Sequence, residues 1–187
     1  MALKATVFKV ELQIADMDRN YYESHALTVA RHASETDERM MVRLLVFALY
    51  ASDALAFGKG IAADDEPTLW EKDLTGTIER WIEVGQPDER EIRKASGRAK
   101  QVVIVTYGRS AEPWWEQNRD KLQRISNLTV LRLPQATTQA LAALANRNMQ
   151  LQCSIQERSV LITTDTGAVQ VDPEVLMGAL GDASANT

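Results

Sequence analysis

Two carboxylates in the segment DLTGTIERWIEVGQP, residues 73–87, are spaced so that they could reach one metal ion. Asp73 opens a short segment that turns at a glycine, and Glu83 lies inside a strand-like run over residues 78–84. Magnesium prefers oxygen ligands and is usually held by one or two carboxylates together with water and phosphate. Bound there, it polarises a phosphoryl oxygen and lowers the pKa of a water molecule. We therefore predict that Asp73 and Glu83 bind Mg²⁺ against a phosphodiester.

The lysine that usually accompanies such a pair of acids is missing. Side chains alternate along a strand, so residue 85 shares a face with Glu83, and a lysine there would point at the same ion. Gly85 occupies that position and cannot stabilise the developing charge. Two residues could substitute. Gln86 is next in the chain, but it faces away unless a bulge at Gly85 turns it. Lys94 lies on the helix that follows.

Lys94 also belongs to a local basic stripe. If its helix folds back against the strand, Lys94 lies about 9 Å along the helix from its start, roughly alongside Glu83. Arg90, Lys94 and Arg98 are spaced i, i+4 and i+8, which puts them on one helix face. This stripe could contact the phosphates of a nucleic acid, or it could be an ordinary solvated helix face.

Three further charged features of the sequence are a single acid, an acidic segment and a lysine. Glu38 lies on the apolar stripe at the start of a predicted helix, where the helix dipole favours a carboxylate and where it could also join a metal site. We interpret the acidic segment 64–66 as a solvated loop. Lys72, beside Asp73, could be an ion-pair partner or a phosphate contact.

Composition indicates an intracellular globular protein. The chain has 187 residues, a formal net charge of −5 and one cysteine, so it has no disulfide framework and no global basic field. Its N-terminus alternates like a strand and lacks the apolar core of a signal peptide. No run approaches the roughly 18 apolar residues that span a membrane. We expect a cytoplasmic location and no membrane partner.

Hydrophobic periodicity predicts an α/β fold with a single mixed β-sheet sandwiched by helices. We predict one domain over residues 1–180 and a flexible tail over residues 181–187. Residues 21–33 are expected to form a helix, because Tyr22, Ala26 and Val29 have helical spacing. The other helices are expected over 34–50, 88–98, 113–124 and 137–146. Strands are expected over 5–17, 54–57, 78–84, 101–107 and 128–133, and within 151–171.

Three segments of the chain resemble the bacterial YaeQ family. They are SETDERMMVRLLVFAL (34–49), LWEKDLTGTIERWIEVGQPDEREIRKASGRA (69–99) and VIVTYG (103–108). The resemblance extends over essentially the whole chain. It implies a variant of the PD-(D/E)XK, restriction-endonuclease-like fold, in a family whose biochemical role is undefined.

The resemblance also implies a role for each candidate residue. Glu38 takes the place of the acid on the early helix, Asp73 that of the acid at the second core strand, and Glu83 that of the acid on the third. The lysine role fails at Gly85. Lys94 and Gln86 are then the two candidates to replace it.

Two functions of different classes follow, with a third left open. The first is an Mg²⁺-dependent nuclease acting on DNA or RNA, which the retained acids favour. The second is a catalytically inactive nuclease-fold protein that binds nucleic acid or a protein partner, which Gly85 and the acidic pI of about 5.1 favour. The third is a metal-binding or regulatory protein that never contacts nucleic acid.

Overall fold

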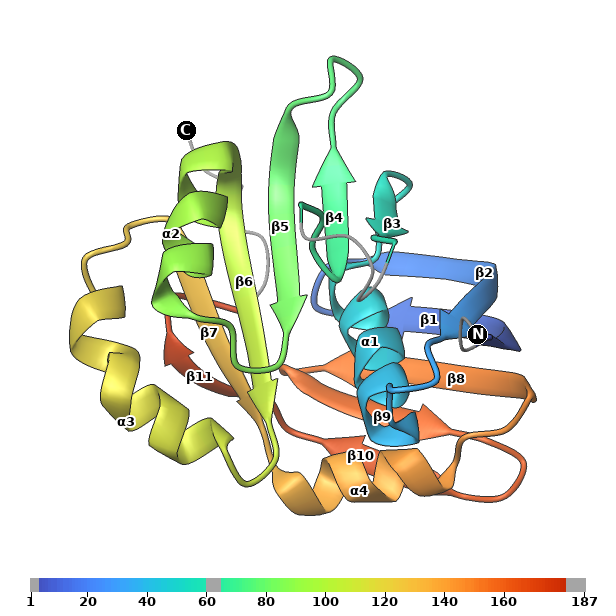
Figure 1. Ribbon diagram of the computed structural model, residues 1–187. Helices are drawn as coiled ribbons and strands as arrows, with labels where there is room; N and C mark the ends of the chain where they lie inside the picture. The colour runs from blue at the N-terminus through green and yellow to red at the C-terminus, as the bar shows by residue number, and fades with distance from the viewer. Residues whose placement is uncertain (1–3, 60–64, 181–187) are drawn as a thin grey trace. The chain divides into compact units, whose positions relative to one another are not determined.

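The computed structural model describes residues 4–59 and 65–180 of the chain. Within these ranges the fold is mixed α/β, with four helices and two mixed sheets (Figure 1). The chain divides into two compact units. One comprises Met1–Leu49 and Pro134–Pro173, and the other comprises Tyr50–Leu133 and Glu174–Thr187. The predicted tail, residues 181–187, lies outside the described residues.

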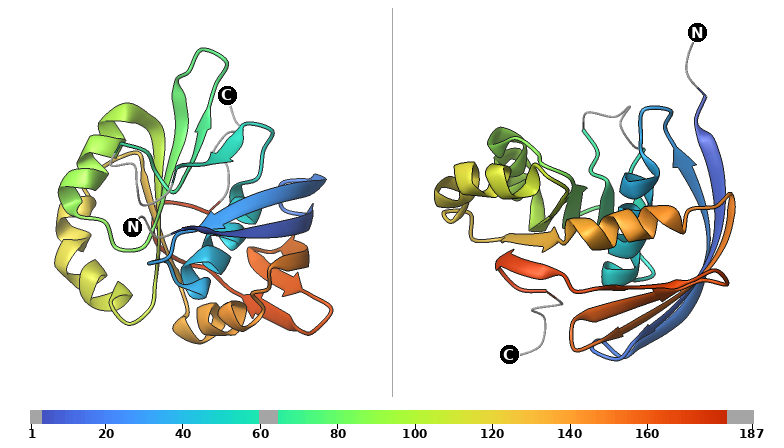
Figure 2. Two further views of the ribbon diagram at one scale, coloured as in Figure 1. Left: turned by 45° about the vertical axis from the view of Figure 1, so that its right-hand side comes forward. Right: turned by 90° about the horizontal axis from the view of Figure 1, so that it is seen from below.

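The first unit is built on a five-stranded sheet with the strand order β10-β9-β8-β1-β2. Its strands are β1 (Thr6–Asp16), β2 (Tyr21–Arg31), β8 (Asn148–Gln156), β9 (Ser159–Thr163) and β10 (Ala168–Val171). Its helices, α1 (Asp37–Tyr50) and α4 (Gln135–Ala143), lie on the same side of this curved sheet (Figure 2). Alternate residues of β1, including Val10 and Leu12, are buried on that side.

The predicted helix over residues 21–33 is wrong, because this segment forms β2. β2 pairs antiparallel with β1 over its full length, with Ala15 opposite Tyr22. The turn between the two strands is fixed by Asp16, whose Oδ1 accepts hydrogen bonds from the backbone N–H groups of Asp18 and Arg19, both at 3.0 Å. Pairing with β1 therefore overrides the helical spacing of a segment in which Val29 is the one fully buried residue.

The second unit carries the candidate site and has the strand order β11-β7-β6-β5-β4-β3. Its strands are β3 (Leu55–Phe57), β4 (Leu69–Lys72), β5 (Ile78–Val84), β6 (Ala99–Tyr107), β7 (Leu128–Leu133) and β11 (Glu174–Met177). β5, β6 and β7 are parallel, whereas β3, β4 and β5 pair antiparallel in turn. The single mixed sheet predicted from the sequence is thus two sheets, because β1 and β2 pair with β8 and not with the strands around β6.

Helices α2 (Glu89–Arg98) and α3 (Ala111–Leu122) connect the parallel strands and cover one face of this sheet (Figure 1). Ile92 and Ala95 of α2 pack with Trp81 of β5 and Val102 of β6 in the core between helix and sheet. A capping box starts α2: Asp88 accepts from the backbone N–H of Arg90 at 2.8 Å, and its own N–H donates to Glu91 at 3.1 Å. The face of β5 that carries Trp81 is therefore the α2 side of the sheet.

Candidate functional site

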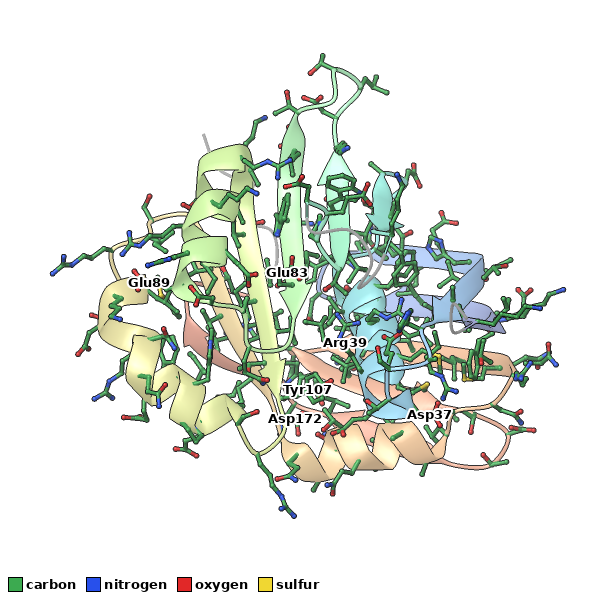
Figure 3. The ribbon with its side chains drawn as sticks, viewed as in Figure 1. Asp37, Arg39, Glu83, Glu89, Tyr107 and Asp172 are labelled. Atoms are coloured by element: carbon green, nitrogen blue, oxygen red, sulfur yellow. The ribbon has the colours of Figure 1, made fainter. Side chains whose placement is uncertain are left out.

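The β4–β5 hairpin places Asp73 and Glu83 at its opposite ends. Asp73 lies in the turn, where its backbone N–H donates to the carbonyl of Thr77 at 2.9 Å. Glu83 lies at the other end of β5 (Figure 3). There it accepts a hydrogen bond from the hydroxyl of Thr68. Glu83 is six positions after Thr77, which corresponds to about 20 Å of strand. The structure therefore does not bring these two carboxylates together, and one metal ion cannot bridge them.

Asp73 has a structural role in the hairpin turn. Its Oδ1 accepts from the backbone N–H groups of Thr75 at 2.8 Å and Thr77 at 2.9 Å, and from the Thr75 hydroxyl at 2.7 Å. The side-chain hydrogen bond from Thr75 is the main cause that lowers the pKa of this exposed carboxyl. These contacts are those of an aspartate that stabilises a tight turn.

Glu83 is half-buried on the α2 side of the sheet and accepts hydrogen bonds on both oxygens. The Thr68 hydroxyl donates to Oε2 at 3.0 Å, and the indole N–H of Trp81 donates to Oε1 at 3.2 Å. Thr68 is buried, and its oxygen also accepts from the backbone N–H of Val84 at 3.2 Å. A threonine thus occupies the position across from Glu83 where a paired acid would have to lie.

An acid does lie close by, three residues before Thr68. Asp65 Oδ1 is 2.9 Å from Lys94 Nζ, and its carbonyl accepts from Arg98 at 3.4 Å. The Lys94 hydrogen bond and charge are the largest causes that lower the pKa of Asp65. Arg98 also lies over the ring of Trp81, with its guanidinium carbon 5.0 Å from the ring centroid.

These contacts connect the start of β4, the end of β5 and one face of α2. Glu83, Trp81, Arg98, Asp65 and Lys94 form this cluster, which we call the β4-start site. The prediction that segment 64–66 is a solvated loop agrees with the 79% exposure of the Asp65 side chain, but it does not include the ion pair of Asp65 with Lys94. Asp64 lies outside the described residues. Antiparallel strand pairing is the signal that could have indicated Asp65. In a hairpin, an acid at the end of the second strand lies opposite the residues that precede the first strand.

Gly85 explains why the expected lysine is absent. Its φ is +122°, in a region that is open to glycine and strained for residues with a Cβ. A Cβ there would meet no atom within 4 Å, so space is not the restriction. The backbone N–H of Gly85 donates to the carbonyl of Val105 at 2.9 Å, which fixes this conformation against β6.

Gln86 is held against the end of β6. Its amide nitrogen donates to the Thr106 hydroxyl at 2.7 Å and to the Tyr107 carbonyl at 2.8 Å. The Ser110 hydroxyl donates to its amide oxygen at 3.3 Å. These bonds join the ends of β5 and β6 to the start of α3, and none of them is made to Glu83.

Glu38 belongs to the first unit and lies in the first turn of α1. Its Oε1 accepts from the hydroxyl of Thr138 on α4 at 2.7 Å. This bond connects the two helices of that unit. Asp73, Glu83 and Lys94 all belong to the second unit.

The predicted basic stripe on α2 is only partly available to a ligand. Lys94 is paired with Asp65, and Arg98 lies over Trp81, whereas the side chain of Arg90 is exposed. Both members of the Lys94–Asp65 pair are largely exposed, at 61% and 79%. Exposed ion pairs contribute roughly 0–1 kcal/mol, so this one can open at little cost.

The described residues include no group of three histidine, cysteine, aspartate or glutamate side chains arranged to hold a metal ion. Asp65 and Glu83 offer two oxygen ligands at one end of the sheet. That is the number that Mg²⁺ takes from a protein when substrate phosphate and water complete its shell. Both carboxylates are of the oxygen-donor type that Mg²⁺ prefers, and each is hydrogen-bonded within the protein, Asp65 to Lys94 and Glu83 to Thr68 and Trp81. Within the same part of the chain, no helix has the length and apolar composition needed to cross a membrane.

Comparison with known proteins gives a consistent picture. Residues 1–173 match the family model described as YaeQ protein. The chain is 43% identical over 173 residues to the uncharacterized protein YaeQ of Escherichia coli (strain K12), covering 92% of this chain and 96% of that one. It is 43% identical over 164 residues to the uncharacterized protein YaeQ of Salmonella typhi, covering 87% and 91%.

Two crystal structures are similar over nearly their full length. The YaeQ protein of Xanthomonas axonopodis pv. citri superposes with a TM-score of 0.91 at 48% identity, covering 94% of this chain and 99% of that one. The YaeQ protein of Pseudomonas syringae also gives a TM-score of 0.91, at 38% identity, covering 95% and 98%. The family match, the sequence relatives and the folds agree, and the chain belongs to the YaeQ family.

Proposed function

We propose that this chain binds the phosphodiester backbone of a nucleic acid at the β4-start site and hydrolyses it with the help of Mg²⁺. One observation carries the proposal: Lys94 of α2 is paired at 2.9 Å with Asp65, which immediately precedes the segment that contacts Glu83. Two acids and one lysine therefore lie at the same end of the hairpin. The sequence predicts the same set of two acids and one lysine, but with Asp73 as the first acid.

The chain order supports a PD-(D/E)XK-like arrangement. From α1 to β6 it runs helix, three strands that pair antiparallel in turn, helix, and a strand parallel to the third. In this arrangement β4 is the second strand, and one acid of the site is expected just before it. Asp65 precedes β4 and takes this role, whereas Asp73 follows β4. The role of Glu38 as the helix acid stays a prediction from the resemblance.

Asp65 and Glu83 would hold the ion, with substrate phosphate completing its shell. Such an ion polarises the phosphoryl oxygen and supplies hydroxide near neutral pH. Lys94 would leave its exposed pair with Asp65 and donate to the phosphate oxygen on which charge develops. Thr68 and Trp81 hold the Glu83 carboxylate in one orientation through their two hydrogen bonds. We assign no catalytic role to Gln86, because its amide is bonded to the end of β6.

A second candidate is nucleic-acid binding without hydrolysis. Its support is specific: Thr68 stands across from Glu83, and the backbone of Gly85 disfavours the motif lysine. Under this alternative, Lys94, Arg98 and Arg90 contact phosphates, and the bonds from Thr68 and Trp81 satisfy the Glu83 carboxylate.

A cleavage assay separates the two candidates. Purified protein is incubated with single- and double-stranded DNA and RNA, with and without Mg²⁺ or Mn²⁺, beside Glu83→Gln and Lys94→Ala. Hydrolysis that needs the metal and falls about 100-fold or more in Glu83→Gln supports the first candidate. Equal hydrolysis by wild type and Glu83→Gln identifies a contaminating nuclease and refutes it. Salt-sensitive binding without cleavage, weakened by Lys94→Ala, supports the second.

A further inference from the structure

Aromatic and basic side chains alternate on the α2 side of the β4–β5 hairpin. Trp70 on β4 is directly opposite Trp81 on β5, and their rings meet edge to face with centroids 6.1 Å apart. Lys72 Nζ lies 3.5 Å from the ring centroid of Trp70, and Arg98 lies over Trp81. A row of two cations and two indoles therefore leads into the β4-start site.

The two indoles differ in what covers them. Trp81 is 7% exposed, packs under α2 and donates its N–H to Glu83, so it belongs to the core. Trp70 is only partly buried, and its neighbour in register on β3 is Ala56, a small and exposed residue. The group over its ring is the ammonium of Lys72, which is itself exposed. Because the Lys72 side chain is flexible, a planar base can displace it from the face of the Trp70 ring.

We infer that Trp70 is a base-stacking site for a single-stranded nucleic acid, with Lys72 moving from the indole ring to an adjacent phosphate. The inference rests on the proposed function and names its substrate class. Stacking on tryptophan requires a base with a free face, which a single strand offers and a base-paired duplex does not. Trp70 also lies two residues from Thr68, about 6.6 Å along the strand, so the phosphate of the stacked nucleotide would reach towards Glu83.

The surface beside Trp70 favours stacking over readout of a particular base. Its neighbours on the same face of β4 are Thr68 and Lys72, and neither carries an amide or a carboxylate. Stacking accepts every base, because each has a π-face. We therefore expect binding that depends on the presence of a base and little on which base it is.

A binding titration in magnesium-free buffer with chelator tests this inference without requiring hydrolysis. The probe is an oligothymidylate of about twelve nucleotides, compared with an abasic strand of the same length and with a blunt duplex. Trp70→Ala should weaken oligothymidylate binding about tenfold and leave abasic-strand binding unchanged. Trp115→Ala is the matched control, since it removes another partly buried indole from the same unit. It should bind as wild type does.

Lys72→Gln gives a second readout, and because Lys72 is exposed we expect the variant to fold as the wild type does. Loss of one phosphate contact should reduce the slope of log K against log salt by about 0.7 for a single strand. Equal losses for thymidylate and abasic strands in Trp70→Ala, an unchanged salt slope in Lys72→Gln, or a preference of the wild type for duplex would overturn the inference. If binding depends on the bases but the protein cleaves no nucleic acid in the cleavage assay, the stacking inference is upheld and the proposed hydrolysis is refuted.

Discussion

Single residues decide what the Glu83 carboxylate can do. The Glu83 carboxylate is half-buried and is hydrogen-bonded by the Thr68 hydroxyl and the Trp81 indole N–H. Arg98 lies over the Trp81 ring and donates to the carbonyl of Asp65, and the Asp65 carboxylate is paired with Lys94. We propose that an ion bound there is held jointly by the protein and the substrate, because the described residues include no group of three possible ligands arranged around one metal ion.

Restoring the motif lysine should harm the protein. Gly85→Lys places a Cβ at φ +122°, a conformation that costs a residue other than glycine roughly 1–3 kcal/mol. We expect the free energy of unfolding in urea to fall by about that amount and the rate of phosphodiester cleavage not to rise. A variant as stable as wild type, or one with faster cleavage, would contradict this account of the missing lysine.

Asp73 should have a pKa below the usual value for an aspartate. Its lowered pKa, due first to the Thr75 hydrogen bond, means that its contribution to stability is complete above its unfolded-state pKa of about 3.9. This contribution is lost as the pH falls through the lower folded-state value. A carboxyl-carbon NMR titration should give a midpoint below the one that the same residue shows in urea. A midpoint equal to the urea value would contradict the turn role.

At the scale of elements, the site depends on how α2 begins. The capping box at Asp88 and Glu91 fixes the first turn of α2, and the helix then presents Lys94 and Arg98 to the segment before β4. Apolar packing of Ile92 and Ala95 holds the opposite side of the helix on the sheet. Helix register therefore determines which cations face Asp65.

Removing the cap should weaken this element measurably. Asp88→Ala deletes the acceptor for the Arg90 backbone N–H, which typically costs about 1 kcal/mol. We expect that loss in urea unfolding, together with faster amide exchange in the first turn of α2. Asp120→Ala, on the exposed surface of α3, is the control and should change stability little. Equal stability of Asp88→Ala and wild type would show that the cap does not stabilise α2.

Sequence patterns predicted most elements of the second unit, but they paired Asp73 with Glu83, which lie at opposite ends of the β4–β5 hairpin. The apolar run of β6 and the Asp88 start signal of α2 are local features, and the structure confirms both elements. Asp65 could not be separated from its acidic neighbours by local pattern, because its role comes from an ion pair with a residue 29 positions away. The strand β2 was mistaken for a helix for the same reason, since its pairing with β1 is not visible in its own spacing.

The whole molecule contains two spectroscopic reporters in different units. All four tryptophans lie in the second unit, and the only cysteine, Cys153, lies in the first. Burial raises the pKa of the Cys153 thiol to about 12, so it is protonated and unreactive in the folded protein. The chain passes between the units after Leu49, after Leu133 and after Pro173, and α1 is continuous across the first of these boundaries.

We expect the two units to unfold together, because three chain passages connect them. Tryptophan fluorescence and the reactivity of Cys153 towards a thiol reagent, measured over one urea series, should give coincident transitions. The thiol should be inert before that transition. Two separated midpoints would show instead that each unit unfolds independently.

The measurement that most directly tests the β4-start site compares Asp65→Asn with Asp73→Asn in the Mg²⁺-dependent cleavage assay. Both changes remove one exposed carboxylate charge and keep an amide oxygen, and the two residues flank the same short strand, β4. Our account predicts that Asp65→Asn lowers the cleavage rate about 100-fold, whereas Asp73→Asn cleaves at the wild-type rate. Loss of cleavage in Asp73→Asn with normal cleavage in Asp65→Asn would contradict it.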